Sequence, residues 1–129
     1  MRKEAEAWIM IAAEELQSAE YLTEKKLFRM VCYHAQQSVE KALKALLVEH
    51  DIEIPRTHNI LDLNNAVKKL GYETKLSDED TVFLNSIYRA RYSAALGLVP
   101  SGEPTEKDAV KALQIARETA RWLKRKSEG

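Results

Sequence analysis

The sequence predicts an all-α protein, an up-and-down bundle of about five helices in which a four-helix core carries one additional helix. Glycine and proline occur only at Pro55, Gly71, the segment 97–104 and Gly129. The stretches between them are rich in strong helix formers such as Ala, Leu, Glu, Lys and Arg. No stretch alternates apolar and polar residues as a half-buried strand would. Because 129 residues is the size of one domain, we expect a single helical domain over residues 1–129.

Residues 3–49 contain neither glycine nor proline, yet their apolar stripe changes direction. On one helical wheel, the apolar positions of residues 5–19 and those of residues 28–46 point roughly 150° apart. A single straight helix would place these two faces on opposite sides. A turn within residues 23–27 brings them together, so the pattern predicts two antiparallel helices with a short connection.

Capping signals divide the remaining chain into three helices. The third helix is predicted to begin near Thr57, as its N-cap, and to be stopped by Gly71. The fourth begins at the capping-box-like sequence that starts with Ser77 and runs to about Leu96. The fifth begins at a similar sequence that starts with Thr105, and its apolar residues follow a heptad-like seam.

Composition excludes several classes of protein. Lys and Arg together number 20, as do Asp and Glu, so a strongly basic, nonspecific nucleic-acid binder is excluded for the whole chain. The single cysteine, Cys32, rules out an internal disulfide or a cysteine-rich zinc site and is expected to be a buried thiol. The scattered His34, His50 and His58 form no zinc-binding spacing, so we expect no metal and no cofactor. No apolar run is long enough to span a membrane, and we expect a soluble, cytoplasmic protein.

Charge is distributed unevenly along the chain. Residues 1–24 carry six glutamates, whereas residues 107–126 are rich in lysine and arginine. Complementary packing and compensation of the dipole at a helix C-terminus account for this pattern. The alternative is a small patch for an anionic partner at residues 121–126.

The second predicted helix carries Gln36 and Glu40 one turn apart at the edge of its apolar stripe. Polar groups at such an edge must find partners. Glu40 can pair with Lys44 along the helix, and an exposed pair of this kind is worth only about 0.3–0.5 kcal/mol.

His34, Gln37 and Lys41 form a separate stripe on the same helix. That stripe is either solvated surface or a face turned toward another subunit or a ligand. We expect a homodimer with these three residues as interface candidates, since Ile115 and Trp122 also lie off the main seam of the last helix. A bundle this small covers its apolar residues incompletely, and apolar residues left uncovered often mark interfaces.

The fourth predicted helix places Arg91 in the middle of an apolar face that also includes Tyr88. A guanidinium cannot be neutralised in a protein, so it needs an anion or a cleft there. We expect Arg91 to reach Glu40, or Gln36 as second choice, at the wall of a cleft. The alternatives are an Arg91 side chain that reaches bulk water or one that faces a ligand or RNA.

The segment His34–Leu47, read as HAQQSVEKALKALL, resembles the signature of the HEPN domain (higher eukaryotes and prokaryotes nucleotide-binding). The resemblance continues upstream in Ala12–Leu22, and downstream in Thr57–Ile60 and the pair Arg91–Tyr92. It implies an α-helical bundle that often dimerises. Such domains commonly work beside a minimal nucleotidyltransferase, as its substrate-binding partner or in a toxin–antitoxin pair.

Some members of that family are metal-independent ribonucleases with an Arg-x(4–6)-His motif in the C-terminal half of the bundle. This sequence departs from the pattern, because no histidine follows Arg89 or Arg91. The matching spacing Arg29-x4-His34 lies in the second helix, where the two side chains point about 140° apart and do not converge.

The resemblance and the residues together predict a non-catalytic binding subunit that takes a nucleotide or RNA. Its cleft would include Arg91, Tyr92, Gln36, Glu40 and Tyr88. Arginine suits an anionic phosphate, and a base can stack on tyrosine. The alternatives are a divergent ribonuclease without the usual histidine and a purely structural dimerisation module.

Overall fold

Five α-helices follow one another in the computed structural model, which describes residues 1–95 and 103–128, with side chains for residues 1–89 and 103–128. Their bounds are α1 Lys3–Glu24, α2 Phe28–Glu49, α3 Ile60–Lys69, α4 Asp78–Ala95 and α5 Glu106–Glu128. None of the described residues lies in a strand. The predicted all-α fold with about five helices is therefore confirmed.

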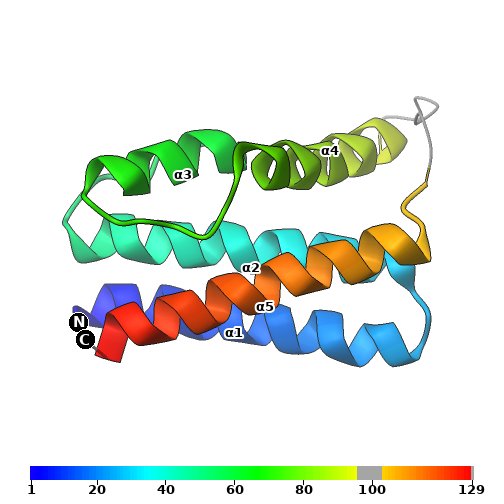
Figure 1. Cartoon of the computed structure of the whole chain (residues 1–129), viewed down its shortest axis with the longest axis horizontal. Coiled ribbons are helices and arrows are strands. Elements are labelled where there is room, and N and C mark those ends of the chain that lie inside the picture. The colour runs from blue at the N-terminus through cyan, green and yellow to red at the C-terminus, as the bar shows by residue number, and fades with distance from the viewer. Residues whose placement is uncertain (96–102, 129) are drawn as a thin grey trace.

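Helix α2 lies at the centre of the bundle (Figure 1). Helices α1 and α2 form an antiparallel pair, and α5 packs against both of them. The shorter helices α3 and α4 lie one after the other along a further side of α2. Three units therefore surround α2, namely α1, α5, and the pair of α3 and α4.

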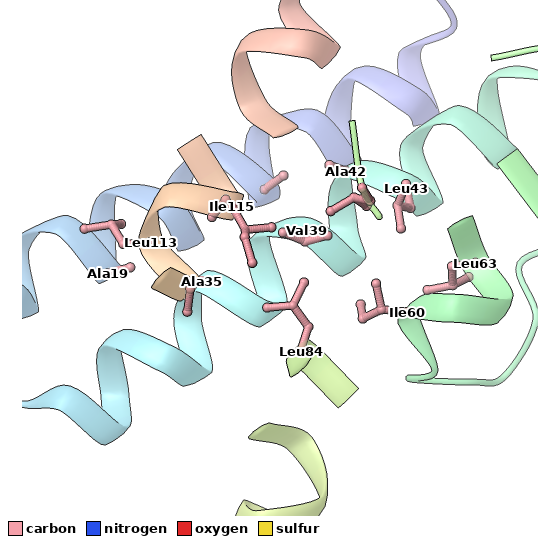
Figure 2. Packing of buried hydrophobic residues seen from close by; sticks show 14 of the residues in the cluster. Ala19, Ala35, Val39, Ala42, Leu43, Ile60, Leu63, Leu84, Leu113 and Ile115 are labelled. Atoms are coloured by element: carbon pink, nitrogen blue, oxygen red, sulfur yellow. The ribbon is translucent and has the colours of Figure 1, made fainter. Parts of the chain in front are cut away.

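The core is built from the apolar residues of α2 and those that reach it from its neighbours. Figure 2 shows Ile60 and Leu63 of α3 and Leu84 of α4 around α2, with Ile115 of α5 on another side. Ile60, Leu63 and Leu84 are completely buried. Burying a side chain of this size stabilises a fold by about 1.5–3 kcal/mol, so these residues hold α3 and α4 against α2.

Helix α1 contributes small residues to its contact with α2. Ala5, Ala12 and Ala19 are buried, and they recur every seven residues on one face. Their small side chains allow the two helices to approach closely. The approach also lets the Ser38 hydroxyl of α2 donate a hydrogen bond of 2.8 Å to the carbonyl oxygen of Ala12.

The predicted turn between the first two helices is confirmed, with α1 ending at Glu24 and α2 beginning at Phe28. The capping box before α4 is formed reciprocally. The backbone N–H of Asp80 donates to Ser77 Oγ over 3.0 Å, and the N–H of Ser77 donates to an Asp80 carboxylate oxygen over 3.3 Å. Thr105 and Asp108 make the same pair of bonds before α5.

The predicted start of the third helix is wrong by two residues, because the N-cap is Asn59 and not Thr57. Helix α3 begins at Ile60, and its N-cap is Asn59, whose side chain accepts a hydrogen bond from the N–H of Asp62. The Thr57 hydroxyl instead accepts from the N–H of Asn59, which stabilises the turn before the helix. The predicted end is confirmed, because Gly71 has φ +98° directly after the C-cap.

Several side chains differ in exposure from the expectation drawn from periodicity. Ile115 and Trp122 are 7% and 3% exposed, so they are core residues of this chain and give no support to a homodimer. Tyr72, in the connection between α3 and α4, covers Trp122 edge-on, with ring centroids 6.0 Å apart.

The prediction that Cys32 is buried is confirmed. Within the described part of the chain, no helix is long and apolar enough to cross a membrane.

Candidate functional site

The centre of α2 carries a completely buried carboxylate, that of Glu40. One oxygen, Oε2, lies 3.1 Å from the Nζ atoms of both Lys41 and Lys44. The other, Oε1, lies 3.0 Å from Nδ1 of His58, which comes from the segment between α2 and α3. Each oxygen of the carboxylate therefore has a hydrogen-bond donor, as a buried charge requires.

The surroundings of Glu40 favour its charged form. Burial by itself would raise the pKa of this carboxyl, because it removes water from the charge. The ammonium groups of Lys41 and Lys44 act in the opposite direction, and so do the hydrogen bonds from His58 and Lys44. Together they hold the pKa of Glu40 below its usual range, so the group is a carboxylate at neutral pH.

The cluster around Glu40 carries more positive than negative charge. Its single carboxylate faces two ammonium groups, and the side chains of Lys41 and Lys44 are only 20% and 9% exposed. The ring of Trp8 on α1 lies 6.0 Å from both Nζ atoms, at the outer limit of a cation–π contact. The predicted pairing of Glu40 with Lys44 is confirmed, whereas the expectation that this pair is exposed is wrong, because both side chains are buried.

Two glutamines continue the polar cluster along α2. The side-chain amide of Gln37 donates to Oε1 of Gln36 over 2.7 Å, and Lys41 Nζ donates to Oε1 of Gln37 over 3.1 Å. Gln36 is completely buried, and its Nε2 has no hydrogen-bond partner among the described residues. The expectation that Gln36 and Glu40 need partners is thus met fully for Glu40 and only in part for Gln36.

His58 connects this cluster to a surface pocket. Its ring stacks on that of Tyr88 from α4, with centroids 4.6 Å apart and planes inclined by 22°. The pocket is open to solvent and has a volume of about 340 Å³. Its lining residues are Arg56, Thr57, His58, Asn59, Asn85, Tyr88 and Arg89. We call it the His58–Tyr88 pocket.

Asn85 of α4 fixes the wall of the His58–Tyr88 pocket. Its Oδ1 accepts a hydrogen bond of 2.8 Å from the N–H of Ile60, and its Nδ2 donates one of 2.9 Å to Oδ1 of Asn59. The same Asn59 oxygen caps α3. The start of α3 is therefore held to α4 at the edge of the pocket. His58 directly precedes this anchored start and contacts Glu40 through its own ring.

The chemistry of the pocket suits an anion with an aromatic group. Arg56 and Arg89 have no carboxylate partner among the described residues, and the lining contains no acidic residue. Guanidinium groups bind phosphate oxygens through paired hydrogen bonds. The stacked rings of His58 and Tyr88 offer an aromatic surface at the same place.

The structure brings three of the five predicted cleft residues into one connected group. Glu40 and Gln36 lie in the buried cluster, and Tyr88 joins it through His58. Arg91 and Tyr92 belong to α4, but their side chains lie outside the described residues. The partners described for Glu40 are Lys41, Lys44 and His58.

Three residues of this site, His58, Arg56 and Arg89, were not predicted from the sequence. A signal for His58 was present, since it lies in the segment Thr57–Ile60 on which the family resemblance partly rested. Arg56 and Arg89 had no such signal. They meet only because the segment before α3 folds back onto α4.

The predicted interface candidates all have partners within the chain. His34 Nδ1 lies 2.7 Å from Oε2 of Glu15 on α1, whereas Gln37 and Lys41 belong to the cluster around Glu40. Gln37 is only 7% exposed, so the solvated-surface interpretation is wrong for it. Arg29 pairs with Glu103, whereas His34 pairs with Glu15. The side chains of Arg29 and His34 therefore diverge, as expected from their spacing on α2.

The described residues include no group of histidine, cysteine and carboxylate side chains that could hold a metal ion. Burial, and to a lesser extent the charge of Asp108, raise the pKa of the Cys32 thiol to about 12. Cys32 is therefore protonated at neutral pH and unsuited to act as a nucleophile.

Solved structures of other proteins are similar to this chain. An archaeal HEPN homologue has 26% sequence identity and a TM-score of 0.68, with 98% of each chain covered. A protein from Thermus thermophilus has 23% identity and a TM-score of 0.72, covering 97% of this chain and 99% of that one. A HEPN domain protein from Thermotoga maritima has 17% identity and a TM-score of 0.69, covering 95% and 98%. The last two similarities concern the fold alone.

The comparison with curated proteins found no match. The model of the HEPN domain matches residues 5–126, which span all five helices from the first turn of α1 to the last turns of α5. The resemblance seen in α2 thus extends over nearly the whole sequence. The chain belongs to the HEPN domain family.

Proposed function

We propose that this protein is a non-catalytic binding subunit that takes a nucleotide, or a nucleotide of an RNA, in the His58–Tyr88 pocket. The observation that carries the proposal is that two guanidinium groups without a carboxylate partner in the described part of the chain line the same pocket as two stacked rings. Arg56 and Arg89 would bind the phosphate, and the rings of His58 and Tyr88 would contact the base. The buried carboxylate of Glu40 orients His58 by accepting the hydrogen bond from its Nδ1.

Calorimetric titration with AMP and ATP tests this pocket. Arg56→Gln combined with Arg89→Gln should weaken binding at least about tenfold, because each change removes charge-assisted hydrogen bonds worth about 1.5–3 kcal/mol. The matched control combines Arg2→Gln with Arg117→Gln, which removes the same charge from arginines that have surface ion pairs elsewhere. Tyr88→Leu should weaken the binding of both nucleotides several-fold, because it removes the aromatic ring but keeps an apolar side chain at that position.

Two results would contradict nucleotide binding at this pocket. One is the absence of saturable binding of either nucleotide at about 1 mM. The other is an equal loss of affinity in the pocket variant and in the control, which would indicate an effect of total charge.

We also propose that the subunit is cytoplasmic, forms a homodimer and works beside a separately encoded minimal nucleotidyltransferase in a toxin–antitoxin-type pair. The match to the HEPN family supports this proposal, because such a subunit would have this helical bundle. Self-association is supported by Met10 and Tyr21 of α1, which are 63% and 62% exposed and lie about three turns apart on one face. A pull-down from the native cell would test the nucleotidyltransferase partner.

Light scattering at high micromolar concentration tests the dimer. The change of Met10 and Tyr21 to glutamate should yield the monomer mass, because the change places charge in an apolar contact. The matched control changes the exposed Val82 and Val110 to glutamate and should leave the mass of a dimer. A monomer mass for the unmodified chain would contradict self-association.

The alternatives make different predictions for the same preparation. Cleavage of RNA in the absence of metal, lost on Arg91→Ala, would favour a divergent ribonuclease. A dimer that binds neither nucleotide nor RNA would favour a structural dimerisation module.

A further inference from the structure

The arginines whose side chains the structure describes fall into two groups. Arg2 pairs with Asp51 and Arg117 with Glu20, at 3.2 and 3.1 Å, and Arg29 pairs with Glu103. The remaining arginines with described side chains have no carboxylate within ion-pair distance in the described structure: Arg56, Arg89, Arg121 and Arg125. Two of these unpaired arginines line the His58–Tyr88 pocket, and the other two line a different one.

That second pocket lies between α5 and the segment that connects α3 to α4. It has a volume of about 250 Å³ and is lined by Lys75, Glu118, Arg121 and Arg125. Arg121 and Arg125 are one helical turn apart, so both side chains lie on one face of α5. Lys75 reaches the same place from the other segment, and it too lacks a carboxylate partner among the described residues.

Compensation of the helix dipole explains only part of this arrangement. Basic residues in the last turns of α5 are stabilised by the dipole wherever they point. Compensation of the dipole does not explain why Lys75, which lies outside α5, adds a third positive charge at the same pocket. Like charges around one cavity repel one another, and an anion between them would remove that repulsion.

The charge of the pocket indicates which anion fits. Three cations against the carboxylate of Glu118 leave an excess of two positive charges. A phosphate monoester carries a charge of about −1.5 to −2 at neutral pH, and its oxygens accept the paired hydrogen bonds that guanidinium groups donate. A carboxylate or a phosphodiester, with one negative charge, would neutralise the pocket only in part.

We propose that Lys75, Arg121 and Arg125 form a second binding site, for a phosphate monoester. The monoester has two possible sources that share this chemistry, a free small phosphate or the 5′-phosphate end of an RNA strand. Glu118 borders the site, and the side-chain amide of Gln114 donates a hydrogen bond of 3.4 Å to its Oε1. The site is separate from the His58–Tyr88 pocket, and its occupancy does not depend on nucleotide binding there.

Phenyl phosphate and a short single-stranded RNA, prepared with either a 5′-phosphate or a 5′-hydroxyl, are the probes. Their binding is followed by the backbone amide signals in NMR titrations. We expect saturable shifts near Lys75 and Arg121, and the affinity of this site is taken from those signals alone, because an aromatic phosphate or an RNA nucleotide can also occupy the His58–Tyr88 pocket. Arg121→Gln combined with Arg125→Gln should raise the dissociation constant at least about tenfold, since it removes two charged donors.

The matched control combines Lys124→Gln with Lys126→Gln. It removes the same charge from the same end of α5, but neither residue lines the pocket. We expect a change of less than about threefold for it, because exposed charges at a distance are screened by salt. Arg56→Gln combined with Arg89→Gln should likewise leave the dissociation constant measured near Lys75 unchanged, whether or not these two changes weaken the binding of AMP.

The two sources give different results, and both support the site. Tighter binding of the 5′-phosphorylated RNA than of phenyl phosphate identifies an RNA end, and equal binding identifies a small phosphate. The proposal is overturned if both α5 variants lose affinity equally, if the 5′-hydroxyl RNA saturates the shifts near Lys75 at the same concentration as the phosphorylated one, or if no probe saturates those shifts.

Discussion

The Nδ1 atom of His58 lies 3.0 Å from the Oε1 atom of Glu40, and this contact joins an exposed pocket to a buried charge. An ionised carboxylate only accepts hydrogen bonds, so Nδ1 of His58 must carry the proton and donate it. The side chain of His58 is 49% exposed, whereas that of Glu40 is completely buried. A change at Glu40 should therefore affect both the stability of the bundle and the orientation of the ring that stacks on Tyr88.

Glu40→Ala should destabilise the fold by about 3–5 kcal/mol, because it leaves the nearly buried ammonium of Lys44 without its carboxylate. Chemical denaturation measures this difference. Glu14→Ala, at an exposed position of α1, is the control and should change stability by less than about 0.5 kcal/mol. A cost below about 1 kcal/mol for Glu40→Ala would mean that the cluster is not a stabilising unit.

Stability should fall in acid through Glu40. Its pKa is held below the usual range in the folded chain and returns to about 4.3 in the unfolded chain. The stabilisation from this difference is present above about pH 4.3 and is lost as the pH falls through the lower, folded-state value. Denaturation curves from pH 6 downward should show a smaller loss in Glu40→Gln than in the unmodified chain. Equal losses in the two proteins would contradict this role of Glu40.

Ser77→Ala should destabilise the chain by about 0.5–2 kcal/mol, because Ser77 Oγ caps α4 by accepting from the N–H of Asp80. The matched control is Ser86→Ala in the interior of the same helix, where the hydroxyl donates to the carbonyl oxygen of Phe83. Alanine is the better helix former, so Ser86→Ala should be neutral or slightly stabilising. Thermal melts compare the two, and equal effects would show that the cap contributes nothing.

Cys32 should not react with a thiol reagent in the folded protein. Its side chain is completely buried, and burial raises the pKa of its thiol to about 12. The reaction rate at pH 8 should therefore follow unfolding and rise to that of a free thiol in denaturant. A fast reaction in native buffer would show that the contact of α2 with its neighbours opens at this position.

The helices themselves could be predicted because their signals are local. A helix turns by the same angle at every residue, so the change of apolar face between residues 5–19 and residues 28–46 requires a turn. The capping pairs at Ser77 and Thr105 act over three residues and were read correctly for the same reason. The exception was Thr57, because the start of α3 is decided by a hydrogen bond that the N–H of Ile60 donates to Oδ1 of Asn85 on a distant helix.

Burial was predicted less well, because one helical wheel does not reveal how many neighbours surround a helix. The wheel placed Gln37 on a separate polar stripe and Trp122 off the main seam, yet both are buried in the structure. Helix α2 lies at the centre with other helices on several sides, so its polar residues had to find partners inside the protein. The sequence indicated that Gln36 and Glu40 need partners, without indicating which ones.

By itself, then, the sequence determined the helical class, the turn before α2, the caps of α4 and α5, and the family. Only the tertiary structure decided that His58 meets Glu40 and that Lys75 meets Arg121. In each pair, one residue lies in the segments 50–59 or 70–77, which have no helical periodicity. The path of such a segment is set by packing and hydrogen bonds to distant helices, and a local pattern contains no record of those contacts.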